Sequence, residues 1–163
     1  SIGARVPLQA ALGEPAAALG LAQLSRIDEI LERRKAVEAS YLEQMLSFEG
    51  IKPPYVGPDV DTVNWMLYVV HLGKRFTASA CAQIIEDLAT ECIETVMFCQ
   101  PLHQQHHYQT LGWARGALPL AERIADRALA LPLHAALAPE HVEFIVKTLK
   151  DSATNVGAGA AIY

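Results

Sequence analysis

The sequence has 163 residues, is 52% hydrophobic and carries a formal net charge of −5, which is typical of one globular domain with enough chain to bury a core. The acidic balance argues against a nucleic-acid-binding surface, and no apolar run reaches the roughly 18 residues of a membrane-spanning helix. We therefore expect neither a nucleic acid nor a membrane among the partners.

At the N-terminus, residues 1–16 are predicted to form an arm, because Gly13 and Pro15 interrupt any continuous helix. A long helix follows, from near Pro15 to about Phe48, and it is about 45 Å long at 1.5 Å per residue. We expect one end of this helix to overhang a small core, which makes it a candidate for contacting another domain or subunit. Its apolar stripe at three-to-four spacing comprises Leu21, Leu24, Ile27, Leu31, Val37, Tyr41 and Met45.

The long helix also carries the basic run Arg33-Arg34-Lys35, which follows three acidic residues of the same helix. Pairs such as Glu29 with Arg33, four residues apart, make this run a solvated and self-compensating face rather than a phosphate-binding one.

The rest of the chain alternates between predicted strands and helices. A strand over 63–72 is aromatic and β-branched, Thr77 caps a helix over 78–89, and a second strand covers 92–98. A helix begins at Pro119 with Leu120, Ile124, Ala128 and Leu129 inside, a short extended piece covers 131–133, and a last helix begins at Pro139 with Val142, Ile145, Val146 and Leu149 on one face.

These elements predict an α+β fold in which helices pack a small sheet of two to three strands, with one long N-terminal helix. The single domain is expected to span residues 17–151. Residues 152–163 are rich in glycine and alanine and are expected to form a flexible tail.

Three cysteines, Cys81, Cys92 and Cys99, are odd in number and show no CxxC spacing. This pattern predicts buried, reduced thiols rather than a disulfide framework. No signal-peptide pattern precedes the domain, so we expect a cytoplasmic location.

The loop after the second strand holds Cys99, His103, His106, His107 and Tyr108, with three of the six histidines within five residues. Such nitrogen and sulfur donors could bind zinc, although their spacing matches no standard zinc finger. Cys99 could instead be a nucleophile with a histidine base, but its position after an apolar segment predicts that it faces the core. A surface loop with solvated histidines is the third reading, and no metal site is assigned.

The residues alone provide no complete catalytic apparatus. The chain has no GxGxxG or Walker-type loop for nucleotide phosphates. None of its five lysines lies in an apolar or glycine- and serine-framed setting that would lower its pKa for Schiff-base chemistry.

Four segments in order suggest a relationship. They are Ala17–Arg34, Trp65–Val70, the run Gln100–His103 with Tyr108 and Leu111–Trp113, and the run Leu118–Arg123 with Leu129–His134. Together they resemble the C-terminal small domain of the DegT/DnrJ/StrS family of PLP-dependent sugar aminotransferases, over roughly residues 1–150.

The resemblance implies homodimers that transfer an amino group from glutamate or glutamine to a keto sugar attached to a nucleoside diphosphate. The family's large domain supplies the Schiff-base lysine and the acid that partners the pyridinium nitrogen, and the segment that would carry it is absent here. PLP is thus expected in the full-length family, whereas this chain alone is expected to bind no cofactor and to be non-catalytic.

The resemblance assigns substrate binding to His103 and Tyr108, with the His103 imidazole hydrogen-bonding the sugar. It assigns cofactor binding to Arg5, because Ser1–Arg5 resembles an arm that reaches the neighbouring subunit's cofactor phosphate; Gly3 stands where the family has asparagine. The alternative is a stand-alone dimerising interaction or ligand-binding module derived from that domain. The expected partners are a second copy of the chain and a nucleotide sugar.

Overall fold

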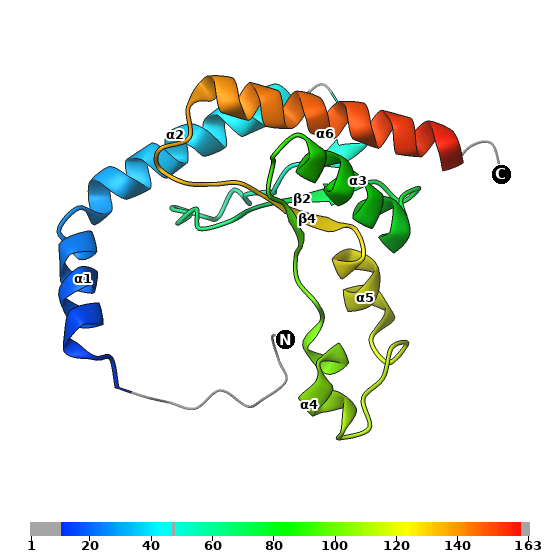
Figure 1. The fold of residues 1–163 in the computed structure, drawn as a ribbon, viewed down its shortest axis with the longest axis horizontal. Coiled ribbons are helices and arrows are strands. Elements are labelled where there is room, and N and C mark those ends of the chain that lie inside the picture. The colour runs from blue at the N-terminus through cyan, green and yellow to red at the C-terminus, as the bar shows by residue number, and fades with distance from the viewer. Residues whose placement is uncertain (1–10, 47, 161–163) are drawn as a thin grey trace.

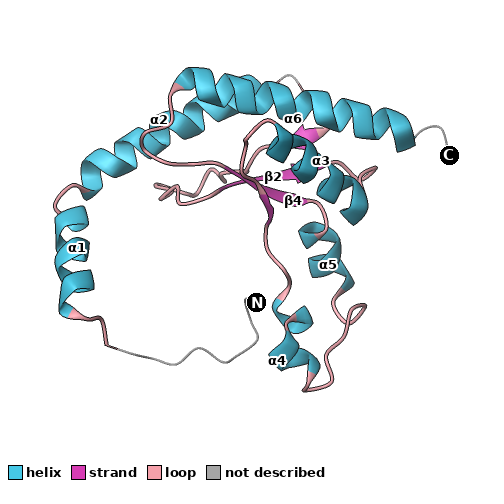
Figure 2. Cartoon of the chain, viewed as in Figure 1, coloured by secondary structure: helices cyan, strands magenta, loops and turns pink. Residues whose placement is uncertain are grey.

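The computed structural model describes residues 11–46 and 48–160, which form six α-helices around a four-stranded sheet (Figures 1 and 2). The helices are α1 (Glu14–Leu24), α2 (Ile27–Met45), α3 (Ala78–Thr90), α4 (His106–Gln109), α5 (Pro119–Ala125) and α6 (Pro139–Ala160). The strands are β1 (Ile51–Lys52), β2 (Tyr68–Leu72), β3 (Val96–Met97) and β4 (Ala128–Leu131). The predicted α+β class is confirmed.

The sheet is antiparallel throughout, with strand order β1-β2-β4-β3. Its centre is the pair β2 and β4, in which Tyr68 lies opposite Leu131 and His71 opposite Ala128. The edge strands β1 and β3 contain only two residues each, which is why the sequence pattern indicated two to three strands rather than four.

The two faces of the sheet differ in how fully they are covered. Along β2, Tyr68, Val70 and Leu72 are buried, and they alternate with the half-buried Val69 and His71. The fully buried face packs against α2, α3 and α6, which cross above the sheet in Figure 1. Helix α3 buries Cys81, Ile84 and Leu88, and α6 buries Val142, Ile145, Val146 and Leu149 as predicted.

The segment predicted as one long helix is divided at Ser25 and Arg26. The hydroxyl of Ser25 donates to the Ala22 carbonyl oxygen, a local bond of the kind that competes with a continuing helix. Helix α2 buries Val37, Tyr41 and Met45, whereas α1 buries no residue. Figure 1 shows α1 turning away from the rest of the domain, so the expected overhang is present.

The prediction for the segment after Pro119 was wrong in its core residues. Helix α5 ends at Ala125, and Leu120 and Ile124 are exposed. Ala128 and Leu129 are buried as predicted, but as members of β4. The short helix therefore lies outside the main core, and the following strand provides the buried residues.

Two terminal predictions involve residues at the limits of the described chain. The arm residues 1–10 lie outside the described residues. Of the segment expected to be a flexible tail, residues 152–160 belong to α6; Ser152 and Ala153 are buried, and the Ser152 hydroxyl donates to the Asp87 carboxylate. Among the described helices, none has both the length and the hydrophobicity needed to cross a bilayer.

Candidate functional site

The predicted substrate residue His103 is buried and paired with a carboxylate. It lies in the 3-10 turn Leu102–Gln104, which follows Pro101. Its Nε2 lies 2.8 Å from Oε1 of Glu122 on α5, and each of the two residues is only 6% exposed. Two segments 19 residues apart in sequence are thereby joined by one buried hydrogen bond.

The Glu122 carboxylate accepts two further donors from the loop that leads into α5. The Gly116 amide lies 2.7 and 2.9 Å from its two oxygens, and the Leu118 amide lies 3.3 Å from Oε1. Gly116 has φ of +97°, a backbone conformation that glycine adopts without strain. The loop thus folds back so that its amides point at the carboxylate.

This environment favours the ionised form of Glu122 and places a proton on the His103 nitrogen that faces it. Burial raises the pKa of Glu122, but the hydrogen bonds from His103, Gly116 and Leu118 outweigh burial and leave that pKa below its usual value. Since an ionised carboxylate only accepts hydrogen bonds, the His103 Nε2 carries the proton that it donates. The Nδ1 atom is then the ring position left for a ligand, and Glu122 fixes the imidazole orientation.

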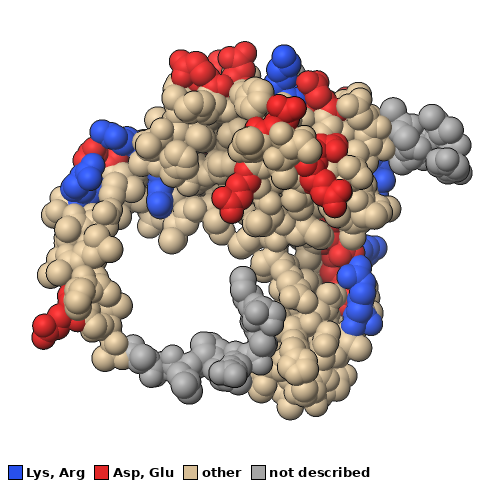
Figure 3. Space-filling model, in the orientation of Figure 1, with Lys and Arg blue, Asp and Glu red and all other residues tan. Residues whose placement is uncertain are grey.

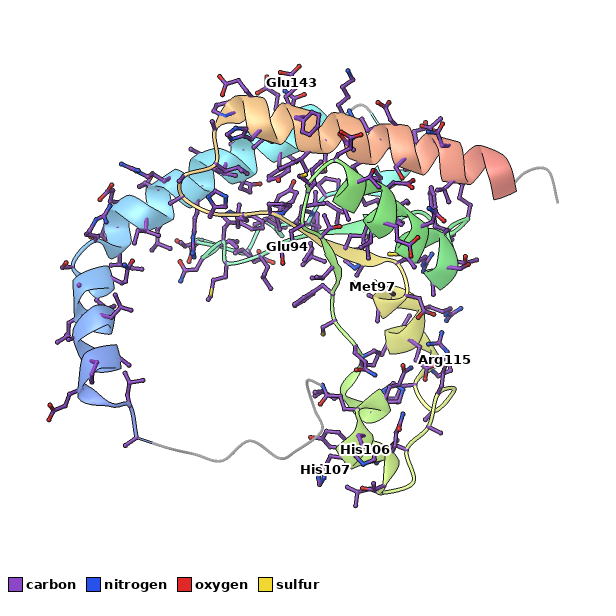
Figure 4. All side chains as sticks on the ribbon, viewed as in Figure 1. Glu94, Met97, His106, His107, Arg115 and Glu143 are labelled. Carbon is purple, nitrogen blue, oxygen red and sulfur yellow. The ribbon has the colours of Figure 1, made fainter. Side chains whose placement is uncertain are left out.

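Tyr108, the second predicted substrate residue, is not among the hydrogen-bond partners of this pair. It is on α4, and its ring meets that of His107 edge-on, with centroids 5.3 Å apart. His106 and His107 are exposed at the far end of the molecule from α6, as Figure 4 shows. Within the described chain, no three histidine, cysteine, aspartate or glutamate side chains are grouped to hold a metal ion.

The cysteine predictions were partly wrong. Cys81 is buried, and burial together with Asp126 raises the pKa of its thiol to about 11. Cys92 and Cys99 are exposed, so Cys99 does not face the core. It lines an apolar cavity of about 450 Å³ on the less covered face of the sheet, and the histidine of that cavity is His71 rather than His103.

The third predicted site residue, Arg5, lies outside the described residues. Its role in holding a cofactor phosphate stays a prediction.

Comparison with known proteins agrees with the fold. The model of the DegT/DnrJ/EryC1/StrS aminotransferase family matches residues 6–150. The chain belongs to this family.

A curated relative and two solved structures illustrate the match. Over 135 residues the chain is 36% identical to GDP-perosamine synthase from Caulobacter vibrioides, an alignment that covers 82% of this chain and 35% of that enzyme. It superimposes on the aminotransferase TlmJ from Streptoalloteichus hindustanus with a TM-score of 0.73 and 28% identity, covering 86% of this chain and 36% of TlmJ. For the PLP form of Spr1654 from Streptococcus pneumoniae the TM-score is 0.80 at 27% identity. This match covers 89% of this chain and 36% of the Spr1654 chain.

The chain therefore spans about a third of the length of the relatives that it matches. The family is PLP-dependent, and PLP chemistry needs a lysine that forms a Schiff base with the cofactor. The lysines of this chain do not fit that role. Lys35, Lys52, Lys74 and Lys147 are exposed, and the Lys150 ammonium donates to the Gln44 carbonyl oxygen.

Glu122 is the residue of this candidate site that the sequence did not predict. It lies in the first turn of a helix that begins with proline, and a glutamate there often reaches back to the amides before the helix. That signal identifies the contacts with Gly116 and Leu118. It does not identify the partnership with His103, which depends on the tertiary fold.

Proposed function

We propose that this chain is the C-terminal small domain of a PLP-dependent aminotransferase that acts on nucleotide-linked keto sugars. The observation that carries the proposal is the match of one family over residues 6–150, although the chain corresponds to only 35% of a relative such as GDP-perosamine synthase. The chain alone is non-catalytic in this proposal, because the Schiff-base lysine belongs to a large domain. We also propose a cytoplasmic location, where the three thiols stay reduced.

The chain's own contribution is to bind and orient. His103, held by Glu122, presents Nδ1 to a sugar hydroxyl or carbonyl oxygen. Tyr108, which follows in the same segment of the chain, supplies a phenol hydroxyl as a second hydrogen-bonding group for the sugar. In a homodimer, Arg5 of one subunit pairs with the phosphate of the cofactor held by the other. The cofactor, when bound by the large domain, supplies the electron sink for amino transfer.

The test is reductive trapping of PLP on the purified chain. The sample is incubated with PLP, reduced with borohydride and analysed by intact mass and peptide mapping. We expect only weak labelling spread over the exposed lysines. A stoichiometric adduct at one lysine would contradict the proposal, because it would place a Schiff-base site within this chain.

The alternative function is a stand-alone dimerising module, and the exposed leucines of α1 favour it. Size exclusion coupled to light scattering under reducing conditions distinguishes the two. A discrete, monodisperse dimer indicates an autonomous module. A polydisperse or aggregating sample indicates a domain whose apolar surface is normally covered by the rest of the enzyme.

A further inference from the structure

A basic groove lies between the start of α3 and one side of α5, with a volume of about 820 Å³. None of the residues assigned to sugar binding lines it. Its walls are formed by Lys74, Phe76, Thr77, Ala78 and Ser79 on one side and by Arg115, Leu120, Arg123, Asp126 and Arg127 on the other.

The groove concentrates positive charge in an acidic chain. Four of its lining side chains are cationic, namely Lys74, Arg115, Arg123 and Arg127, against the single carboxylate of Asp126. That carboxylate is already paired with Arg115. Figure 3 shows lysine and arginine atoms gathered beside α5, whereas the surface over α3 and α6 carries mainly aspartate and glutamate. Cations crowded in this way repel one another until an anion compensates them.

Two of the guanidinium groups are held in place by their own backbone. The Nε of Arg123 donates to the Pro119 carbonyl oxygen at 3.2 Å, and the Nε of Arg127 donates to the Arg123 carbonyl oxygen at 3.0 Å. These bonds leave the Nη amino groups outside them, and a guanidinium fork matches the spacing of phosphate oxygens. Because both side chains are already ordered, an anion that binds them loses less conformational entropy.

The opposite wall of the groove adds polar groups that also favour an anion. The Thr77 and Ser79 hydroxyls lie 2.8 Å apart at the start of α3, a helix of 13 residues. First-turn amides of a helix of this length favour negative charge. These groups add to the binding of an anion by the arginines, and they would not define a site without the arginines.

We propose that this groove binds a diphosphate group. Its cations exceed its carboxylates by three, which suits the two to three negative charges of a diphosphate better than the charge of a small monoanion. The inference stands independently of the proposed function, because it uses neither His103 nor Tyr108.

The experiment is a titration of the 163-residue chain with sodium pyrophosphate at constant ionic strength, followed by calorimetry or by NMR. We expect saturable binding with a Kd below about 1 mM, weakened at least about tenfold in the double variant Arg123→Gln, Arg127→Gln. The matched control is Arg33→Gln, Lys147→Gln, which removes the same net charge from exposed positions on α2 and α6. It should bind within about twofold of wild type.

Three results would overturn the proposal: no saturation, unchanged binding in the groove variant, or an equal loss in the control. If the double variant fails to fold, Lys74→Gln alters an exposed side chain of the groove and should still weaken binding about threefold. Competition with dTDP-glucose identifies the source of the diphosphate. Displacement of pyrophosphate indicates a nucleotide sugar, and its absence indicates a free diphosphate.

Discussion

Glu122 is a buried carboxylate whose partners come from three positions, the imidazole of His103 and the amides of Gly116 and Leu118. Replacing it by glutamine removes one acceptor oxygen and introduces donors that face the existing donors. We predict that Glu122→Gln lowers the urea midpoint of unfolding at pH 7 and weakens any sugar contact of His103, because its imidazole loses its fixed orientation. Urea unfolding and NMR of the His103 ring measure the two effects.

The effect should depend on pH in a defined direction. Because folding lowers the pKa of Glu122, its ionised form stabilises the fold above the ordinary glutamate pKa of about 4.3. That stabilisation disappears as the pH falls through the lowered pKa of the folded state. The difference in urea midpoint between wild type and Glu122→Gln should therefore be largest at pH 7 and should decrease below about pH 4. Glu143→Gln, at an exposed position on α6 (Figure 4), is the control; an equal change there would refute the prediction.

The features of this site that could be predicted from the sequence are those that depend on neighbouring residues, whereas contacts between distant segments could not be predicted. His103 is predicted as a site residue because its run of neighbours resembles a family motif, and its role in binding a sugar stays a prediction. The placement of Cys99 was wrong, because an apolar segment before a residue does not show which sheet face lies open. The pairing of His103 with Glu122 needs the path of the chain from α4 to α5, and no local pattern encodes it.

At the scale of elements, two stacked tyrosines join α2 to the sheet. The rings of Tyr41 and Tyr68 lie 4.5 Å apart, and both are fully buried. The Tyr41 hydroxyl donates to the Pro132 carbonyl oxygen at 2.8 Å, whereas that of Tyr68 has no hydrogen-bond partner within the described chain. We predict that Tyr41→Phe costs about 1 kcal/mol of unfolding free energy, because it leaves a carbonyl oxygen without its donor.

The matched variant is Tyr68→Phe, which makes the same chemical change in the adjacent ring. It should leave the free energy of unfolding within about 0.5 kcal/mol of wild type or raise it, since a buried hydroxyl without a partner costs desolvation. Chemical denaturation of both variants at pH 7 provides the comparison. Equal losses of unfolding free energy in Tyr41→Phe and Tyr68→Phe would contradict the prediction, because the hydrogen bond to Pro132 would then make no measurable contribution.

The elements themselves were predictable where their signals are local. Thr77 caps α3 by accepting from the Ala80 amide, and Pro139 begins α6. The break between α1 and α2 and the end of α5 at Ala125 were not predicted, because the apolar spacing continues through both. Packing decides these boundaries: α1 has no core to cover, and the residues after α5 enter the sheet.

For the whole molecule, the question is what covers its exposed apolar side chains. On α1, Leu21 and Leu24 are 68% and 62% exposed, and the helix contributes nothing to the core. We predict that the isolated chain self-associates and that α1 drives this association. Burying two such leucines per protomer contributes about 1.5 kcal/mol for each side chain, so the variant Leu21→Gln, Leu24→Gln should be monomeric at micromolar concentration. Glutamine keeps a good helix propensity, so α1 itself should persist.

Light scattering across a concentration series tests this prediction against a control of equal chemistry. Leu111→Gln, Leu120→Gln removes two leucines that are 64% and 65% exposed, outside α1. If α1 carries the contact, the control should associate as wild type does while the α1 variant stays monomeric. Equal dissociation in both would instead mean that association follows total exposed apolar area, because the hydrophobic effect is non-directional and needs no particular helix.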